Sequence, residues 1–285
     1  MPTLRDIRRR IRSVESTQKI TRAMQMVAAA KFNRAQADVQ TLRPFAEGME
    51  ALLGHFLRCG EPADHPLLAR EEIRKRALVV VSSDRGLCGA YNSSIFRAAE
   101  KEIREAEDPE GVGVIALGRR VSDFLRRRSH KILFDFEMLG DRLSTTGARE
   151  IALHLQHMYA TGEVDQVDVL YTRFISTMSR EVVVKPVLGI RLDTEEAEGG
   201  APYILEPPGE QLLGDLLPRV LFTRVVAVLA EVFASEHSAR MTAMRLATDN
   251  ATELLDELTL VRNRMRQAAI TRELADIVGS AEAMA

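Results

Sequence analysis

The side chains best suited to chemistry lie in the loop "SSDRGLCGAYNSS", which spans residues 82 to 94 and follows an apolar run. Glycines ahead of a helix N-terminus can cradle a phosphate, because backbone N–H groups point at the anion there. The spacing is Gly86-x-x-Gly89, which matches neither the dinucleotide-binding G-x-G-x-x-G nor the triphosphate-binding G-x-x-x-x-G-K-[ST]. We favour a tight strand-to-helix turn, with phosphate binding as the alternative.

Three other candidates for chemistry carry weaker signals. Cys88 would need a base and an orienting group to act as a nucleophile, and the sequence indicates neither. His154 and His157 lie three residues apart on a predicted helix, but no third metal ligand is evident. The Gly-Arg-Arg stretch at 118–120 suits an anion site or a solvated basic turn, and we favour the turn. We therefore expect no catalytic residue, no metal and no cofactor.

The composition favours a protein without a membrane span. The chain has 285 residues, 46% of them hydrophobic, and a net charge of -2. No stretch approaches the roughly 18 consecutive apolar residues that a span needs, and no cleavable targeting segment is evident. Two cysteines are too few for a disulfide framework and favour a reducing compartment. Residues 1–34 hold nine Arg or Lys against two acids, a basic block that suits an acidic partner or solvent.

Residues 1–60 form the first of three segments and follow a heptad pattern. Thirteen of sixteen seam positions are apolar, which predicts a long helix with one buried stripe. At about 1.5 Å per residue, some 55 helical residues would extend over about 80 Å. The three polar positions are consecutive and lie within the seam, which reads Leu4, Ile7, Ile11, Val14, Gln18, Thr21, Gln25, Ala28, Phe32, Ala35, Val39, Leu42, Ala46, Met49, Leu53 and Phe56.

The second segment, residues 75–192, alternates strand and helix signals. Apolar runs such as "ALVVVSS", "GVGVIALG" and "KILFDFEM" are each followed by a helical stretch. This alternation predicts a mostly parallel, Rossmann-like sheet with helices on its faces. The last two runs, "VDVLYTRFI" and "REVVVKPVLGI", are joined by "STMS", which indicates a hairpin and an antiparallel edge strand.

The third segment, residues 208–285, continues as helix almost to the C-terminus. Two long terminal helices around an α/β domain should pair antiparallel, with the numbers of facing residues summing to roughly 264–268. About twenty C-terminal residues then lack a partner, although they carry a bare apolar stripe. We expect other polypeptides to enclose it, since such a stripe is unfavourable in water. The stripe consists of Met265, Ala268, Ala269, Ile270, Leu274, Ile277 and Val278.

Three stretches together resemble the γ subunit family of F-type ATP synthases. They are "STQKITRAMQMVAAAKFNRAQ", "SSDRGLCGAYNSSI" and "SEHSARMTAMRLATDNATELLDELTLVRNRMRQAAITRELADIVG", and the resemblance covers the whole chain in the correct order. It implies an asymmetric antiparallel coiled coil inside an α3β3 hexamer, with the α/β domain near ε and the membrane c-ring. It also implies a non-catalytic rotor that couples rotation of the ring, driven by ion (proton) flow, to ATP synthesis or hydrolysis in the β subunits. The complex would be peripheral to the cytoplasmic face of a bacterial inner membrane.

The resemblance also carries over positions of contact. Met24 and Arg240 match the family's coupling-sensitive region, and Glu206 matches the foot residue that meets the c-ring. Leu205 and Arg262 depart from the family pattern, which has tyrosine at both positions. The C-terminal residues that match the family's contacts with a β-subunit catch loop, or lie beside them, are Arg266, Gln267, Thr271 and Asp276.

The resemblance supplies an interpretation of the polar interruption at residues 18–25: this part of a shaft is polar because it meets changing surfaces of acidic stator loops. Two other hypotheses stay open. One is a Rossmann-like nucleotide-binding enzyme with helical dimerisation arms. The other is a coiled-coil hairpin that binds nucleic acid through its basic N-terminus, against which the lack of interleaved aromatics counts.

Overall fold

The computed structural model describes residues 3–59, 65–68, 72–106, 108–109, 111–136, 139–189 and 209–282. The chain divides into two compact units. The coiled-coil unit comprises residues 1–28 and 241–285, and the α/β unit comprises residues 29–240. Two long helices contribute to both units: α1 (Leu4–Cys59) and α5 (Gly209–Glu282). The predicted fold class, an α/β domain inserted between long terminal helices, is confirmed.

In the coiled-coil unit, α1 and α5 pack antiparallel through the predicted seam. Ile7 and Ile11 are buried and form a cluster with Leu258 of α5. The low-numbered end of α1 thus meets the high-numbered part of α5, as the heptad pattern of both segments requires. Val14, Leu254, Leu255 and Met265 pack around this cluster.

The axial register of the two helices differs slightly from the prediction. Hydrogen bonds join Gln18 to Thr252 and Thr21 to Thr248, pairs whose numbers sum to 270 and 269. In the α/β unit, Arg43 pairs with Glu231, and these numbers sum to 274. The predicted range of 264–268 was therefore too low by up to about two helical turns. Turn residues mark where helices end, but side-chain packing along the seam sets their stagger.

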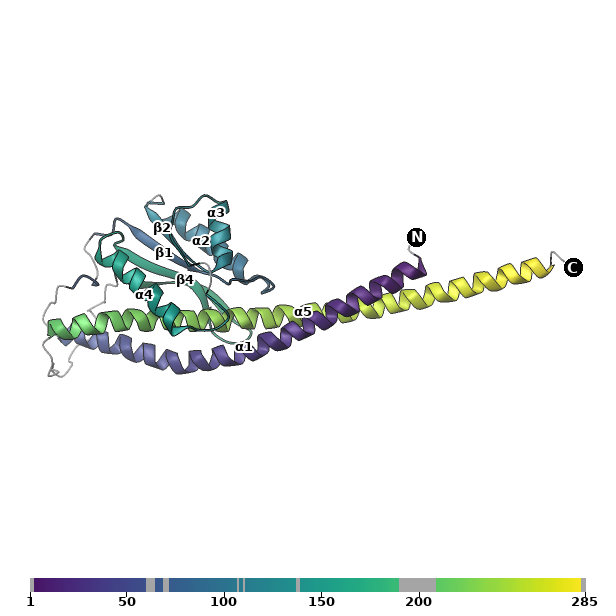
Figure 1. The fold of residues 1–285 in the computed structure, drawn as a ribbon, viewed down its shortest axis with the longest axis horizontal. Coiled ribbons are helices and arrows are strands. Elements are labelled where there is room, and N and C mark those ends of the chain that lie inside the picture. The colour runs from purple at the N-terminus through teal and green to yellow at the C-terminus, as the bar shows by residue number, and fades with distance from the viewer. Residues whose placement is uncertain are drawn as a thin grey trace. The chain divides into compact units, whose positions relative to one another are not determined.

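A five-stranded sheet of order β3-β2-β1-β4-β5 forms the centre of the α/β unit (Figure 1). Its strands are β1 (Arg76–Val81), β2 (Val112–Leu117), β3 (Ile132–Phe136), β4 (Gln166–Phe174) and β5 (Arg180–Leu188). The first four strands are mutually parallel, with Val79 of β1 opposite both Ile115 of β2 and Val169 of β4. β5 runs antiparallel to β4, which confirms the predicted hairpin and its turn at 175–179.

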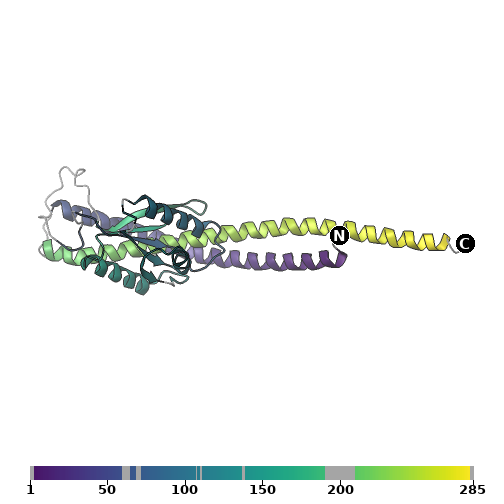
Figure 2. The same cartoon turned by 90° about the horizontal axis from the view of Figure 1, so that it is seen from above.

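Both faces of the sheet are covered. On one face, α2 (Tyr91–Glu105) and α3 (Arg119–Arg127) pack on Leu78 and Val80 of β1. On the other lies α4 (Thr145–Ala160), whose apolar side buries Leu155 (Figures 1 and 2). Side chains on both faces of β1 are therefore buried, which explains its uninterrupted apolar sequence. No helix in the described part of the chain is both long and apolar enough to cross a bilayer.

Gly118 joins β2 to α3 at a point where the backbone permits only glycine. Its φ angle is 102°, a left-handed conformation that side chains disfavour. A Cβ atom added there would collide with the backbone carbonyl oxygen of Ser82. The turn therefore holds two neighbouring strand ends at close approach.

We predict that Gly118→Ala lowers the free energy of unfolding of the α/β unit by about 1–3 kcal/mol, because it combines backbone strain with this collision. The measurement is chemical unfolding of the purified chain followed by tyrosine fluorescence, since Tyr91, Tyr159 and Tyr171 lie in this unit. Gly86→Ala is the matched control, because nothing lies within 4 Å of its added Cβ. Equal stabilities of the two variants would refute the prediction.

Candidate functional site

The C-terminal part of α5 is exposed along all of its described length. No described side chain after Met265 is buried, and Leu274 and Ile277 are 57% and 62% exposed. Arg266, Gln267 and Thr271, which the sequence analysis singled out, all lie here and are exposed. Asp276 belongs to the same helix, whereas Glu206 lies outside the described residues. This end of α5 presents a mixed apolar and polar surface to whatever surrounds it.

The polar interruption of the seam faces the partner helix. Gln18 Nε2 donates to Thr252 Oγ1 at 2.7 Å, and the hydroxyls of Thr248 and Thr21 hydrogen-bond at 2.8 Å. Thr21 is buried. The interpretation that these positions are polar because they meet other chains was therefore wrong for Gln18 and Thr21. Their polarity is satisfied between the helices, where such bonds favour one register over others.

Met24 is half-buried in the same unit, which also carries exposed apolar side chains on both helices. Ile20, Met26 and Val27 of α1 are each more than half exposed, as are Leu246 and Leu260 of α5. Exposed aliphatic groups on both helices indicate a surface that other protein chains cover. Met24 belongs to the same unit as these exposed groups.

Arg240 lies at the end of the α/β unit and is mainly internal. Its guanidinium forms an ion pair with Glu236 of the preceding turn at 2.6 Å. The two side chains are only 13% and 8% exposed. Arg240 Nη2 also donates to the carbonyl oxygen of Gly86, in the loop after β1, at 3.3 Å. This arginine therefore connects α5 with the edge of the sheet.

The residues between Glu236 and Arg240 contact two further loops. His237 Nε2 lies 3.1 Å from the carbonyl oxygen of Asp141, whose carboxylate pairs with Lys31 of α1 at 2.8 Å. Ser238 Oγ donates to the carbonyl oxygen of Thr177, in the β4–β5 turn, at 2.7 Å. No catalytic or metal-binding sequence motif marks His237 and Ser238, although polar residues within a strongly apolar helix are a usable signal of buried polar contacts.

The loop at 82–94 is a tight turn in which Ser83 and Asn92 bond to each other. The Ser83 amide and hydroxyl both donate to Asn92 Oδ1, at 3.2 and 2.9 Å. Gly89 has a φ of 60°, as a sharp turn before a helix requires. Burial raises the pKa of the Cys88 thiol, which keeps it protonated and a poor nucleophile.

In doubly wound folds, ligands bind outside the carboxyl ends of the strands where the strand order reverses, here between β1 and β4. That position is occupied by the chain itself. Arg240 of α5 binds the loop after β1, and Ser238 binds the turn after β4. The arrangement therefore joins a helix to the sheet at the place where other α/β proteins hold a nucleotide.

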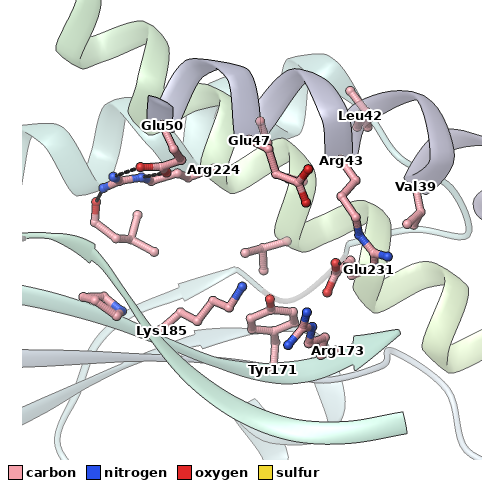
Figure 3. A pocket seen from close by; sticks show the side chains of 15 residues that line it. Val39, Leu42, Arg43, Glu47, Glu50, Tyr171, Arg173, Lys185, Arg224 and Glu231 are labelled. Carbon is pink, nitrogen blue, oxygen red and sulfur yellow. Dashed lines mark hydrogen bonds and ion pairs between the residues drawn. The ribbon is translucent and has the colours of Figure 1, made fainter. Parts of the chain in front are cut away.

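A cavity of about 310 Å³ separates the two long helices from β4 and β5 (Figure 3). Two arginines bridge its sides. Arg43 of α1 binds Glu231 of α5 at 2.8 Å and the carbonyl oxygen of Phe174 at 2.9 Å. Arg224 of α5 pairs with Glu50 of α1 and donates to the carbonyl oxygen of Val187 at 2.8 Å.

The contacts around the cavity join α1, α5 and the β4–β5 hairpin to one another. Each helix supplies one arginine to a carboxylate of the other helix and to one strand of the hairpin. Tyr171 lies on the sheet side, and burial raises its pKa well above the ordinary value, so it stays a neutral phenol. Charge-assisted bonds of this kind fix geometry across an interface. These arginine contacts therefore have a structural role: they hold the helix pair on the sheet.

The fold and these contacts define a class of protein: an α/β unit fixed to two long helices, one of which ends in an uncovered apolar surface. A family model described as ATP synthase matches residues 3–284. The chain is 45% identical over 284 residues to the ATP synthase gamma chain of Moorella thermoacetica, with full coverage of both chains. It is 41% identical over 292 residues to that of Heliobacterium modesticaldum, again with full coverage. The chain therefore belongs to the ATP synthase gamma chain family, the non-catalytic subunits of that complex.

Solved structures show the same fold. A chain of the Euglena gracilis mitochondrial ATP synthase, in a structure of its OSCP, F1 and c-ring, matches with a TM-score of 0.71 at 20% identity. The match covers 99% of this chain and 94% of that one. A chain of the Tetrahymena thermophila central stalk and c-ring matches with a TM-score of 0.61 at 23% identity, covering 80% and 99%. These findings support the γ-type interpretation and lend no support to a free-standing nucleotide-binding enzyme.

Buried His237 gives the α/β unit a defined pH dependence. Burial lowers its pKa below the ordinary value near 6.5. The unfolded chain then binds a proton at a pH where the native state does not, so stability falls as the pH drops below about 6.5. The contribution is fully present above this value and is lost at up to about 1.4 kcal/mol per pH unit.

We predict that His237→Gln flattens this loss between about pH 6.5 and the lower native pKa, because glutamine does not titrate. Chemical unfolding at a series of pH values, followed by tyrosine fluorescence, measures the slope. His157→Gln, on the exposed side of α4, is the control. If the slopes of wild type and His237→Gln coincide, the burial of a neutral imidazole is not what destabilises the unit in acid.

Proposed function

We propose that this chain is the central-stalk rotor of an F-type ATP synthase, which couples proton-driven rotation of a membrane c-ring to the conformational cycle of catalytic β subunits. The observation that carries the proposal is the exposed apolar end of α5. Its aliphatic side chains have no cover within the described chain, so a surrounding sleeve of other polypeptides is required. The full-length similarity to gamma chains supports this role.

The partners follow from this assignment. An α3β3 hexamer would enclose α5 beyond residue 265 and supply the stator contacts to Met24, Gln267 and Thr271. Arg266 and Asp276 lie beside these positions and are proposed as part of the same contact. Glu206 would meet the c-ring at the foot, with ε bound nearby. The complex would lie on the cytoplasmic face of a bacterial inner membrane, with this chain attached only through its partners.

The distribution of contacts suits a turning shaft. The strong polar contacts, such as Arg43–Glu231 and Glu236–Arg240, lie inside the chain and survive rotation. The outer surface of the coiled-coil unit carries exposed basic and aliphatic side chains. Exposed ion pairs contribute only about 0–1 kcal/mol each, so contacts to the stator can form and break during each turn. A deeply buried intermolecular pair would cost several kcal/mol to break.

Met24→Lys tests the placement of the stator contact. A new positive charge on this half-buried position, opposite acidic stator loops, should form an ion pair that resists rotation. We expect ATP hydrolysis to persist in inverted membrane vesicles while ATP-driven proton pumping falls by about tenfold. Met178→Lys is the control, because Met178 is the most exposed of the large apolar side chains and lies on the β4–β5 turn. Normal pumping by Met24→Lys would place this residue away from the stator.

Deletion of residues 267–285 tests the role of the exposed helix end. Every side chain among them whose burial the structure describes is exposed, so their loss should leave the α/β unit folded. An affinity tag on the chain, used to isolate complexes from native membranes, should recover fewer α and β subunits with the truncated form than with the full chain. Loss of the α/β unit's circular dichroism on truncation would contradict this account. A full chain that recovers no ATPase subunits would refute the proposed function itself.

A further inference from the structure

One stretch of α5 is enclosed on every side. Residues 232–239 are all buried, the longest uninterrupted buried run in the described part of this helix. A helix that packs against one partner buries only one stripe, so eight consecutive buried residues require neighbours all around. Four members of the run are polar: Ser235, Glu236, His237 and Ser238. Apolar packing alone would not require these four polar side chains.

Glu236, His237 and Ser238 contact backbone carbonyls of three separate loops at the carboxyl edge of the sheet, Glu236 through Arg240, whereas the buried Ser235 hydroxyl has no hydrogen-bond partner among the described residues. Through Arg240, Glu236 reaches Gly86 of the loop after β1. His237 contacts the Asp141 carbonyl, in the loop before α4. Ser238 bonds to the Thr177 carbonyl of the β4–β5 turn. Because each bond goes to a different loop, the set resists rotation of α5 about its axis more than apolar packing alone would.

The other long helix is held at the same place. Lys31 of α1 pairs with the Asp141 carboxylate at 2.8 Å, while the Asp141 carbonyl meets His237 of α5. One residue of the α/β unit therefore contacts both helices. The set also lies next to the limit of the unit, which falls between residues 28 and 29 on α1 and between 240 and 241 on α5. The contacts are concentrated where both helices leave the α/β unit.

We propose that Lys31, Asp141, Glu236, His237, Ser238 and Arg240 form a torque clamp, which makes the α/β unit and the helix pair turn as one body under load. The proposal rests on the rotor function above and deepens it. These are positioning residues: they act through the attachment of the helices. In particular, Arg240 affects coupling through Glu236 and the loop after β1, inside the chain, and not by a stator contact.

The Glu236–Arg240 pair allows a direct test. Glu236→Gln, Arg240→Gln and the double variant are introduced into the whole ATP synthase, and the ratio of proton pumping to ATP hydrolysis is measured in inverted vesicles. The opposing proton gradient is raised in steps, so that the load on the rotor increases. The amount of assembled complex in each preparation is measured separately, because a folding defect changes that amount but not the ratio.

The clamp predicts that each single variant lowers the pumping ratio by about fivefold at high gradient. The double variant should be no worse than Arg240→Gln alone, because that change already removes the pair with Glu236 as well as the bond to Gly86. Arg240→Lys should recover part of the ratio. Lys101→Gln and Glu105→Gln, which alter an exposed i,i+4 pair on α2, are matched controls and should behave as wild type.

Two results would overturn the clamp. If Arg240→Gln lowers the ratio while Glu236→Gln leaves it intact, Arg240 acts outside the chain, on the stator. If neither lowers it at any gradient, the set has only a folding role. Should both variants fail to assemble, Ser238→Ala and Lys31→Gln provide the same test with milder changes, and an unaltered ratio in both likewise refutes the clamp. In each of these cases the rotor function stands, since recovery of ATPase subunits with the full chain tests it independently.

Discussion

The burial of apolar surface on α5 is the interaction on which the rest of this molecule depends. Along one continuous helix, the environment changes from complete enclosure at 232–239, to one buried stripe in the coiled-coil unit, to full exposure beyond Met265. Each change is matched by the side chains. Glu236, His237 and Ser238 have polar partners where the helix is enclosed. A heptad seam is buried where one helix faces the other, and an aliphatic stripe remains where other polypeptides must supply the cover.

The α/β unit illustrates how a common architecture takes on a mechanical role. Its parallel strands and strand order would place a nucleotide at the carboxyl edge between β1 and β4. Here Ser83 and Asn92 of the loop at 82–94 bond to each other, Arg240 of α5 binds the Gly86 carbonyl of the same loop, and Ser238 binds the β4–β5 turn. The groups that would bind a ligand instead attach a helix. The same fold could serve to bind a nucleotide or to attach a helix. The contacts of these side chains favour attachment of the helix.

Polar contacts in this chain are placed where motion should not occur. Arg43 and Arg224 bridge the helix pair and the β4–β5 hairpin around a cavity, and Glu236 with Arg240 holds α5 at the edge of the sheet. Gln18 and Thr21 bond across the coiled coil instead of facing outward. In a rotor, such internal bonds keep the shaft and its base together, while the outer surface offers weaker contacts to the stator.

The sequence by itself determined the elements and their order. Heptad spacing predicted both long helices, alternating strand and helix signals predicted the parallel sheet, and the short "STMS" link predicted the hairpin, because these patterns depend on local periodicity. The sequence also predicted the exposed end of α5, because the N-terminal helical segment is shorter than the C-terminal one and cannot cover all of it. The direction in which Gln18 and Thr21 point, the register of the helices, and the enclosure of residues 232–239 were decided only by the tertiary structure. Each depends on groups far apart in the chain, such as Asp141 with Lys31 and Gly86 with Arg240, and no local pattern records which loops meet at one edge of a sheet.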